Sequence, residues 1–307
     1  MKSEIYHVCN TLQEVKDAAE YLDKAVIGKL DINVAGSKRE VDNFVGTYNM
    51  NKGKMCASVI PQYNLIQHKE YFVGFAEALG RLNLDYSMTM TQTGNRAFAD
   101  IDFKNKNIKF DKLNEEFTTG IRLINSYDKS TGLYVIPRYT RLACTNGMII
   151  TRSEKTLSIK HHAKIAREIE SFIEIKISEI INSRSDLQEW VSSSMKDSIE
   201  WLTACKIVEK LFSQLKHREE ILKNLGISVI SIEDKKTKKK LVSYVWNNEE
   251  EKKDKLTRWD MYNAMTKYIT HGEHITPHIQ NLFHRQAEKL LSIPLAKIPI
   301  IKNTLKV

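Results

Sequence analysis

The spacing of apolar residues changes from helical to strand-like near Leu84. Before that point, apolar side chains recur at helical intervals over 11–22, where TLQE forms a capping box, and over 68–82. The Gly- and Lys-punctuated stretch between these helices ends in an extended run, KMCASVIPQYNLI. From Leu84 on, apolar and polar residues alternate over 84–91 and 96–103, with Thr-Gly-Asn between the two runs. The pattern predicts two helices followed by an antiparallel β-meander.

A hairpin follows the meander. Strands are predicted at 119–126 and 132–141, and the segment that joins them, SYDKSTG, is rich in turn-forming residues. Pro137 indicates an edge or a bulge in the second strand, because proline has no N–H to donate to a neighbouring strand. We expect the side chains of Asn125 and Asp128 to shape the turn through hydrogen bonds to the backbone, and Asn146 to do the same where the second strand ends.

The second half of the chain has helical spacing over most of its length. From residue 160 the apolar residues follow a helical period as far as Gly226, and a second capping box, SDLQ at Ser185, predicts the start of a new helix within this stretch. A short β-type run, ISVISI, comes next. Thr257 then predicts an N-cap, and Pro277 predicts the first turn of the last helix.

These patterns predict an α+β fold with two domains. Residues 1–160 are expected to form an antiparallel β-meander and hairpin sheet with packed helices, and residues 161–307 a mainly helical domain. The charge-dense segment at about 233–256, which holds the apolar island LVSYVW, is interpreted as an exposed loop or an edge hairpin.

Composition narrows the class of protein. The chain has 307 residues and 42% hydrophobic content, as expected of a globular protein. Its first residues are charged where a signal peptide is apolar, and no run approaches the roughly 20 apolar residues that span a bilayer, so we expect a cytoplasmic protein with no membrane contact. The cysteines occur singly, which favours small buried hydrophobes over disulfides, zinc ligands or nucleophiles. They are Cys9, Cys56, Cys144 and Cys205.

The charge balance favours an anionic partner. The formal net charge is +9 and the isoelectric point is about 9.1. Basic side chains that neutralise phosphates gain affinity from counterion release. A lysine-rich solvated surface that binds nothing is the alternative, and net charge does not separate the two.

The hairpin holds the first candidate nucleic-acid surface. Arg138 and Arg141 flank Tyr139, which places positive charge for phosphates beside a ring for base stacking. The alternative is that Tyr139 fills the core while the arginines pair with nearby carboxylates. The candidate partners are Asp100, Asp102 and Asp128.

Further basic residues stand on both sides of the hairpin. If the helix predicted after Lys160 packs across the sheet, these residues would border one groove with the hairpin arginines and form a positive track. Scattered lysines on a solvated face are the alternative. The residues are Lys104, Lys106 and Lys109 in the segment FKNKNIKFDK, interpreted as a connection, and Lys160, His161 and Lys164 before the long helix.

No catalytic centre is predicted. The chain lacks a P-loop and the G-x-G-x-x-G, H-E-x-x-H and G-x-S-x-G patterns. Asp100 and Asp102 share one strand face and are the best candidates for holding Mg²⁺, which keeps a metal-dependent nuclease as an alternative. The C-terminal histidines include one i, i+4 pair, but a helix begins between its members, so no metal site or cofactor is predicted. These histidines are His271, His274, His278 and His284.

The run INSYDKSTGLYVIPRYTRLACTNGM resembles the N-S-x-D-G-S … R-x-x-C-x-N core of the phage- and plasmid-like proteins known as domain of unknown function 932. IKHHAKI and TRWDMYNAMTKYITH are similar to that family's basic-His step and C-terminal N-A-x-T-x-Y-x-x-H element, so the likeness covers roughly residues 60 to 292. Lys129 stands where the family tends to have glycine, and Gly147 follows Asn146. The resemblance implies a role with mobile-element DNA and supplies no catalytic residues.

The order of elements is also similar to the β-β-β-α core of phage single-strand annealing proteins, which bind DNA in a basic groove and assemble into rings or filaments. We therefore expect a non-enzymatic mobile-element protein that binds and anneals single-stranded DNA, forms homo-oligomers and acts in recombination or replication. The alternatives are the nuclease and a viral assembly or host-defence-interacting protein, whose basic patches would meet an acidic host or viral partner.

Overall fold

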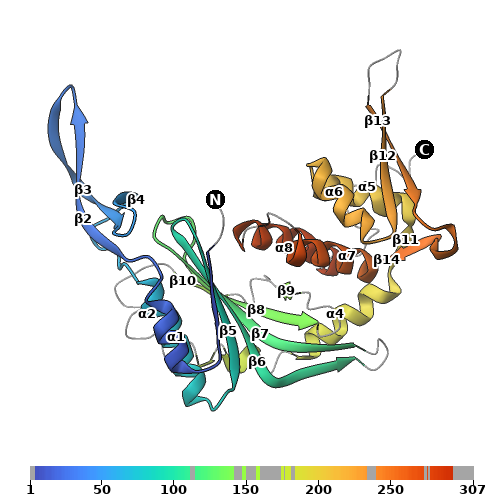
Figure 1. Ribbon diagram of the computed structural model, residues 1–307, viewed down its shortest axis with the longest axis horizontal. Coiled ribbons are helices and arrows are strands. Elements are labelled where there is room, and N and C mark those ends of the chain that lie inside the picture. The colour runs from blue at the N-terminus through green and yellow to red at the C-terminus, as the bar shows by residue number, and fades with distance from the viewer. Residues whose placement is uncertain are drawn as a thin grey trace. The chain divides into compact units, whose positions relative to one another are not determined.

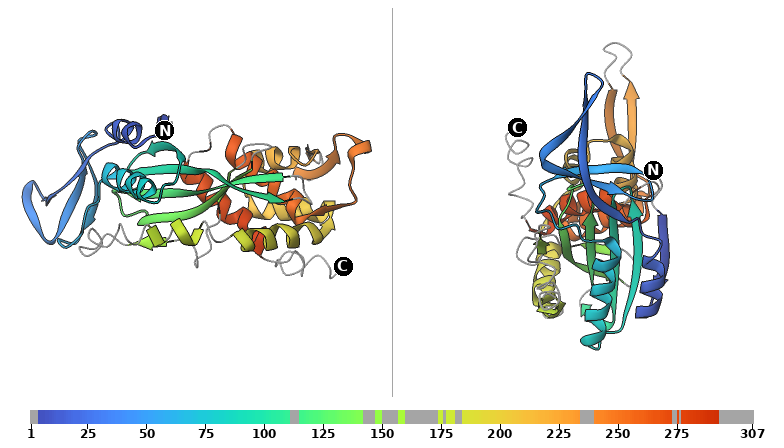
Figure 2. Two further views of the ribbon diagram at one scale, coloured as in Figure 1. Left: turned by 90° about the horizontal axis from the view of Figure 1, so that it is seen from below. Right: turned by 90° about the vertical axis from the view of Figure 1, so that its left-hand side faces the viewer.

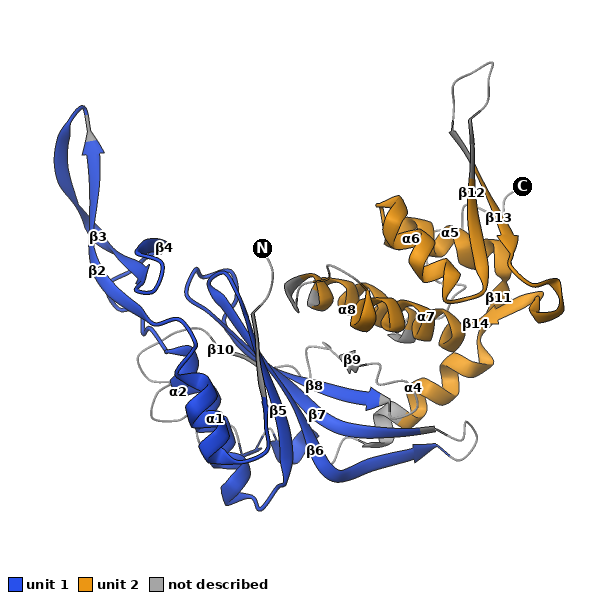
Figure 3. Cartoon of the chain, viewed as in Figure 1, with its two compact units in different colours: residues 1–142, 149–183, 276–278 blue, residues 143–148, 184–275, 279–307 orange. Residues whose placement is uncertain are grey.

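The computed structural model describes two compact units (Figure 3). Unit 1 comprises residues 1–142, 149–183 and 276–278, and unit 2 comprises 143–148, 184–275 and 279–307. Within the chain, the described residues are 4–110, 115–141, 147–149, 157–159, 174–175, 177–180, 184–233, 240–272, 275 and 277–292. In these ranges, none of the helices combines the length and the apolar content that crossing a bilayer requires.

The main sheet of unit 1 contains the predicted meander and hairpin, and the strands along it pair antiparallel (Figure 1). Its order is β1-β5-β6-β7-β8-β10. The alternation seen in the sequence is confirmed in β5, where buried and half-buried side chains alternate without interruption. The bounds are β1 Glu4–Cys9, β5 Tyr86–Thr93, β6 Arg96–Phe110, β7 Glu115–Ser126, β8 Leu133–Arg141 and β10 Leu157–Ile159, with β9 Gly147–Ile149 between β8 and β10 in sequence.

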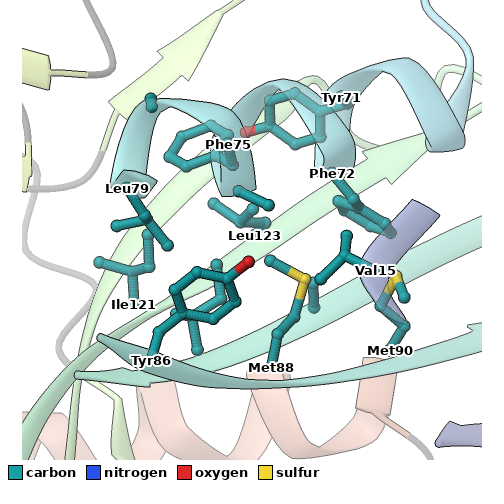
Figure 4. Packing of buried hydrophobic residues seen from close by; sticks show 14 of the residues in the cluster. Val15, Tyr71, Phe72, Phe75, Leu79, Tyr86, Met88, Met90, Ile121 and Leu123 are labelled. Carbon is teal, nitrogen blue, oxygen red and sulfur yellow. The ribbon is translucent and has the colours of Figure 1, made fainter. Parts of the chain in front are cut away.

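Two predicted helices cover one face of this sheet. They are α1 (Leu12–Ala19) and α2 (His68–Arg81), and Thr11 caps α1 as predicted by accepting a hydrogen bond from the Glu14 backbone N–H at 3.2 Å. Figure 4 shows the apolar stripe of α2 packed on the strands. Each large side chain buried there contributes about 1.5–3 kcal/mol. The fully buried members include Phe72, Phe75, Leu79, Met88, Met90, Ile121 and Leu123, and also Ile177 and Ile180 from the stretch of helical spacing after residue 160.

β6 is longer than its pattern predicted. The segment 103–112, interpreted as a connection, is strand as far as Phe110. Asn105 has φ 60°, and the pairing with β7 shifts between Asp102 and Asn107, so a bulge interrupts the ladder. Ile108 and Phe110 are buried beyond it. Apolar alternation did not reveal this strand, because lysines and asparagines occupy most positions from 104 to 109.

A second sheet in unit 1 forms an arm. Its last strand lies in the predicted extended run KMCASVIPQYNLI, whereas the sequence pattern did not predict the first two strands. The sheet has the order β2-β3-β4, with β2 Ala25–Val34, β3 Ser37–Asn49 and β4 Lys54–Val59. Both views of Figure 2 show the β2–β3 hairpin extending beyond α1 and α2. Most side chains of β3 from Ser37 to Phe44 are exposed. Because neither face of this part is covered, no alternating apolar pattern marks it.

Unit 2 mixes helices with two small antiparallel sheets, β11–β14 and β12–β13. The α+β class with antiparallel sheets is thus confirmed for the described chain. The capping box at Thr257 is confirmed, since its hydroxyl accepts from the Asp260 N–H at 3.0 Å. The elements are α4 Arg184–Lys196, β11 Ser198–Glu200, α5 Trp201–Leu211, α6 Leu215–Lys223, β12 Ile227–Glu233, β13 Lys240–Trp246, the 3₁₀ turn Glu249–Glu251, β14 Lys255–Thr257, α7 Arg258–His271 and α8 Pro277–Ser292.

Candidate functional site

A group of opposite charges lies on the sheet face turned away from α1 and α2. We call Asp100, Asp102, Arg122, Arg138 and Thr140 the paired-charge cluster. Arg122 donates from Nε to Asp100 Oδ1 and from Nη2 to Asp100 Oδ2, both at 2.5 Å. Arg138 donates from Nη1 to Asp102 Oδ1, which also accepts from Thr140 Oγ1 at 2.9 Å. A bidentate pair of this kind is among the stronger charge-assisted interactions.

Glycine in β7 leaves room for this cluster. Gly120 pairs with Asp102 on one side and Arg138 on the other, so the arginine can reach across the strand that separates it from its carboxylate. A Cβ at Gly120 would lie 2.1 Å from the Ile101 carbonyl oxygen and 3.0 Å from Asp102 Oδ1. A side chain at this position would therefore force β6 and β7 apart.

The structure places two predicted contact residues inside the protein. Tyr139 is 2% exposed, so its ring is not available for base stacking. The side chain of Arg138 is 12% exposed and pairs with Asp100 and Asp102. Burial alone would lower the pKa of Arg138, but these two carboxylates raise it above its ordinary value, so the guanidinium stays charged. For both residues this is the interior alternative that the sequence left open.

The same contacts bear on the nuclease alternative. Asp100 accepts two hydrogen bonds from Arg122, and Asp102 accepts from Arg138 and Thr140. A cation would have to displace these donors, at the cost of leaving buried positive charge without a partner. Among the described residues, no group of three or more His, Cys, Asp and Glu side chains is placed to hold a metal ion.

The predicted lysines of the 103–112 segment lie on β6, beyond the bulge. Lys104 and Lys109 are exposed and Lys106 is half-buried. Lys109 pairs in register with Glu116 on β7, whose carboxylate accepts from the Asn107 side chain at 2.8 Å. The remaining predicted contacts cannot be placed: the side chain of Arg141 and the residues Lys160, His161 and Lys164 lie outside the part of the chain that is described.

A buried polar junction joins the arm to the main sheet, and sequence reasoning missed it. At its centre, the Tyr127 hydroxyl donates to the Asp23 carbonyl oxygen and accepts from the His68 backbone N–H, both at 2.9 Å. The His68 ring stacks on the Tyr127 ring with centroids 3.7 Å apart. Thr47 of β3 donates from its hydroxyl to the Tyr127 carbonyl oxygen at 2.9 Å. Tyr127 belongs to the family-like motif NSYD, which was the one available signal.

The carboxylate of Asp23 anchors the other side of this junction. Its Oδ2 accepts from Lys52 at 2.7 Å, from Asn49 at 2.8 Å and from Gln92 at 2.7 Å. Burial would raise the pKa of this carboxyl, but these three hydrogen bonds and the charge of Lys52 hold it below its ordinary value of 3.8. A pocket of about 670 Å³ opens beside it and includes Tyr127 in its lining, a volume typical of small-molecule sites.

The lowered pKa of Asp23 gives a stability prediction. A folded-state pKa below the ordinary value means that the ionised carboxyl stabilises the fold above that value, and that this stabilisation is lost as the pH falls through the lowered pKa. We expect Asp23→Asn to lower the free energy of unfolding by about 1 kcal/mol at neutral pH, allowing for the partly exposed Lys52, and by progressively less as the pH falls below the ordinary carboxyl pKa of 3.8. Urea unfolding across this range measures the difference. Asp42→Asn, at an exposed position of the arm, is the control, and a constant difference for Asp23→Asn would contradict the prediction.

The turn after β7 is built partly as predicted. Asp128 Oδ1 accepts from the Ser130 N–H at 3.0 Å, which confirms its role in the turn. The prediction for Asn125 was wrong, because its side chain donates to the Ile66 carbonyl oxygen at 3.0 Å and so serves the core. Lys129 has φ 59°, a conformation that glycine adopts without strain. Asn146 lies beyond the described residues.

The described cysteines are buried or half-buried. Cys9 and Cys205 are buried as predicted, and burial raises the pKa of both thiols, to about 12 for Cys205. Cys56 is half-buried and Cys144 is not described. Of the C-terminal histidines, His271 is exposed and His284 is buried, while the side chains of His274 and His278 fall outside the described set.

Comparison with known proteins places the chain in a family. No curated protein and no solved structure matches it significantly. The model of one family, described as a domain of unknown function (DUF932), matches residues 56–291, which is more than half of the chain. The match contains β5 to β8, the NSYD motif and the capped helix α7, and it begins after β3. The protein therefore belongs to the DUF932 family.

Proposed function

We propose that this protein binds the DNA of a mobile element, a virus or a plasmid, that it prefers single strands, and that it anneals them in recombination or replication. The observation that carries the proposal is the row of three lysines, Lys104, Lys106 and Lys109, on β6. Among the described residues these lysines have no ion pair, and the neighbouring paired-charge cluster balances two arginines with two aspartates. The three β6 lysines therefore contribute to the net charge of +9 and favour an anionic partner at this strand.

The annealing part of the proposal rests on topology. Strands β5 to β8 form an antiparallel meander, and helical residues at 174–175 and 177–180 follow it in sequence. This order is similar to the β-β-β-α core of phage single-strand annealing proteins, which act as rings or filaments. We propose a homo-oligomer, in which Arg141, Lys160, His161 and Lys164 extend the track that begins on β6.

The test replaces the three β6 lysines together by alanine. We expect affinity for a fluorescent single-stranded oligonucleotide to fall roughly tenfold or more, and the slope of log affinity against log salt to flatten by about two. The matched control removes three exposed lysines of unit 2, Lys196, Lys206 and Lys210, and so changes the net charge by the same amount.

Three outcomes would contradict the proposal. Equal losses in the two triple variants would show that net charge, and not the β6 row, sets the affinity. If the wild-type chain does not bind the intact oligonucleotide at low salt, DNA is not the partner. Salt-sensitive binding to a host or viral protein would then favour the alternative of a viral assembly or host-defence-interacting protein. Cleavage of the oligonucleotide in the presence of Mg²⁺, seen on a denaturing gel, would instead support the alternative of a metal-dependent nuclease.

A further inference from the structure

One aromatic ring of the arm lies flat on the backbone of two strands. Tyr48 of β3 pairs with Val26 of β2, and the glycines next along this face, Gly28 and Gly46, pair with each other. A Cβ on Gly46 would lie 2.5 Å from the Tyr48 ring, and one on Gly28 would lie 3.2 Å from it. The Tyr48 hydroxyl donates to the Lys29 carbonyl oxygen at 2.8 Å. The ring is thus fixed over the two glycines while it stays half-exposed.

Other apolar side chains of the arm are also open to solvent. Phe44 of β3 is 46% exposed, and Ile27 and Ile32 of β2 are 41% and 47% exposed. These side chains come from both strands of the β2–β3 hairpin, and exposed apolar patches are where binding surfaces form. The region that matches the family model begins at residue 56, so β2 and β3 lie outside it.

The arm is also positively charged. Residues 24–54 contain six lysines or arginines and three acidic residues. Lys29 pairs with Glu40 at 2.9 Å. The exposed side chains of Lys38, Arg39 and Lys54 have no ion pair among the described residues. Aromatic rings interleaved with basic side chains on a strand surface are the combination that single-stranded nucleic acids require.

The base of the arm is held in place. Thr47 donates to the Tyr127 carbonyl oxygen at 2.9 Å, and Asn49 donates to Asp23 Oδ2 at 2.8 Å. Both residues are at most 1% exposed. Buried contacts of this kind fix the direction in which β3 leaves the main sheet, so the Tyr48 ring is positioned before any ligand arrives, which lowers the entropic cost of binding.

We propose that the arm is a stacking platform for single-stranded DNA, in which Phe44 and Tyr48 hold bases while Lys38, Arg39 and Lys54 contact phosphates. This proposal rests on the proposed function. It assigns base stacking to Phe44 and Tyr48, in place of the buried Tyr139. A second copy of the chain is the less favourable occupant, because two arms that meet would bring their excess of positive charge together.

The test combines a double variant with crosslinking. In Phe44→Leu/Tyr48→Leu, leucine keeps apolar cover over the glycines and removes the aromatic faces. We expect affinity for single-stranded DNA to fall about tenfold or more, and Ile27→Ala/Ile32→Ala, which removes similarly exposed apolar surface, to change it by about twofold or less. In the wild-type chain, an oligonucleotide carrying 5-iododeoxyuridine should photo-crosslink to the tryptic peptide Glu40–Lys52, which contains both rings.

The outcomes separate the two proposals. A wild-type chain that binds no single-stranded DNA would overturn both. Wild-type binding that the leucine variant retains, with crosslinks confined to other peptides, would overturn only the role of the arm. A leucine variant that keeps its DNA affinity and changes its oligomeric state in light scattering would assign the arm to contact between copies.

Discussion

Gly120→Ala is expected to lower the free energy of unfolding by about 3 kcal/mol, a large effect for one methyl group. The added Cβ would lie 2.1 Å from the Ile101 carbonyl oxygen, which is backbone of the adjacent strand and cannot rotate away as a side chain can. Relief therefore requires β6 and β7 to separate. The same Cβ would approach Asp102, so the contact of that carboxylate with Arg138 should be disturbed as well.

A matched substitution in α2 should have the opposite sign. Gly74 lies inside this helix, and a Cβ there meets nothing within 4 Å. Alanine loses less conformational entropy than glycine on entering a helix, so Gly74→Ala should stabilise the protein by about 0.5–1 kcal/mol. Urea unfolding of both variants measures the contrast. Equal and small effects would contradict the close approach of β6 and β7 at Gly120.

The parts of the fold that could be predicted are those where burial and period coincide. β5 alternates buried and half-buried positions throughout, and Thr257 and Asp260 form a local capping box that needs no tertiary contact. The helix predicted through Ile199 is broken, because residues 198–200 pair with β14 instead. That pairing joins segments more than fifty positions apart, and no local spacing reports it.

The candidate site was less accessible to sequence reasoning for the same reason. The Tyr127 hydroxyl and the Asp23 carbonyl oxygen are joined across 104 positions. The choice between an exposed and an interior Tyr139 depended on which face of β8 packs on the helices, and Pro137 gave no information on that point. The sequence did not mark Tyr48 as a site residue, because its ring is placed by Gly28 of β2, and the pairing of the two strands is not visible in local spacing.

The paired-charge cluster leads to the second large effect. Arg122→Ala is expected to lower the free energy of unfolding by about 2–3 kcal/mol. Arg122 is 5% exposed, and its loss would leave the Asp100 carboxylate without its bidentate partner. The Asp100 side chain is 25% exposed, and Arg138 Nε lies 4.0 Å from Asp100 Oδ2. We therefore expect a smaller loss than for an isolated, fully buried charge.

A double-mutant cycle separates this pairing from simple loss of packing. If the charges are coupled, Asp100→Ala/Arg122→Ala should be more stable than the sum of the two single variants predicts, by about 1–2 kcal/mol, because removing both partners leaves neither charge uncompensated. Glu20→Ala/Lys69→Ala, which removes an exposed ion pair, is the control and should show much weaker coupling, because solvent screens exposed charges. Additive effects at Asp100 and Arg122 would mean that the cluster contributes through its packed side chains alone. Coupling would mean that Asp100 is neutralised by Arg122. That carboxylate would then not neutralise the β6 lysines, whose charge would remain to attract an anionic ligand.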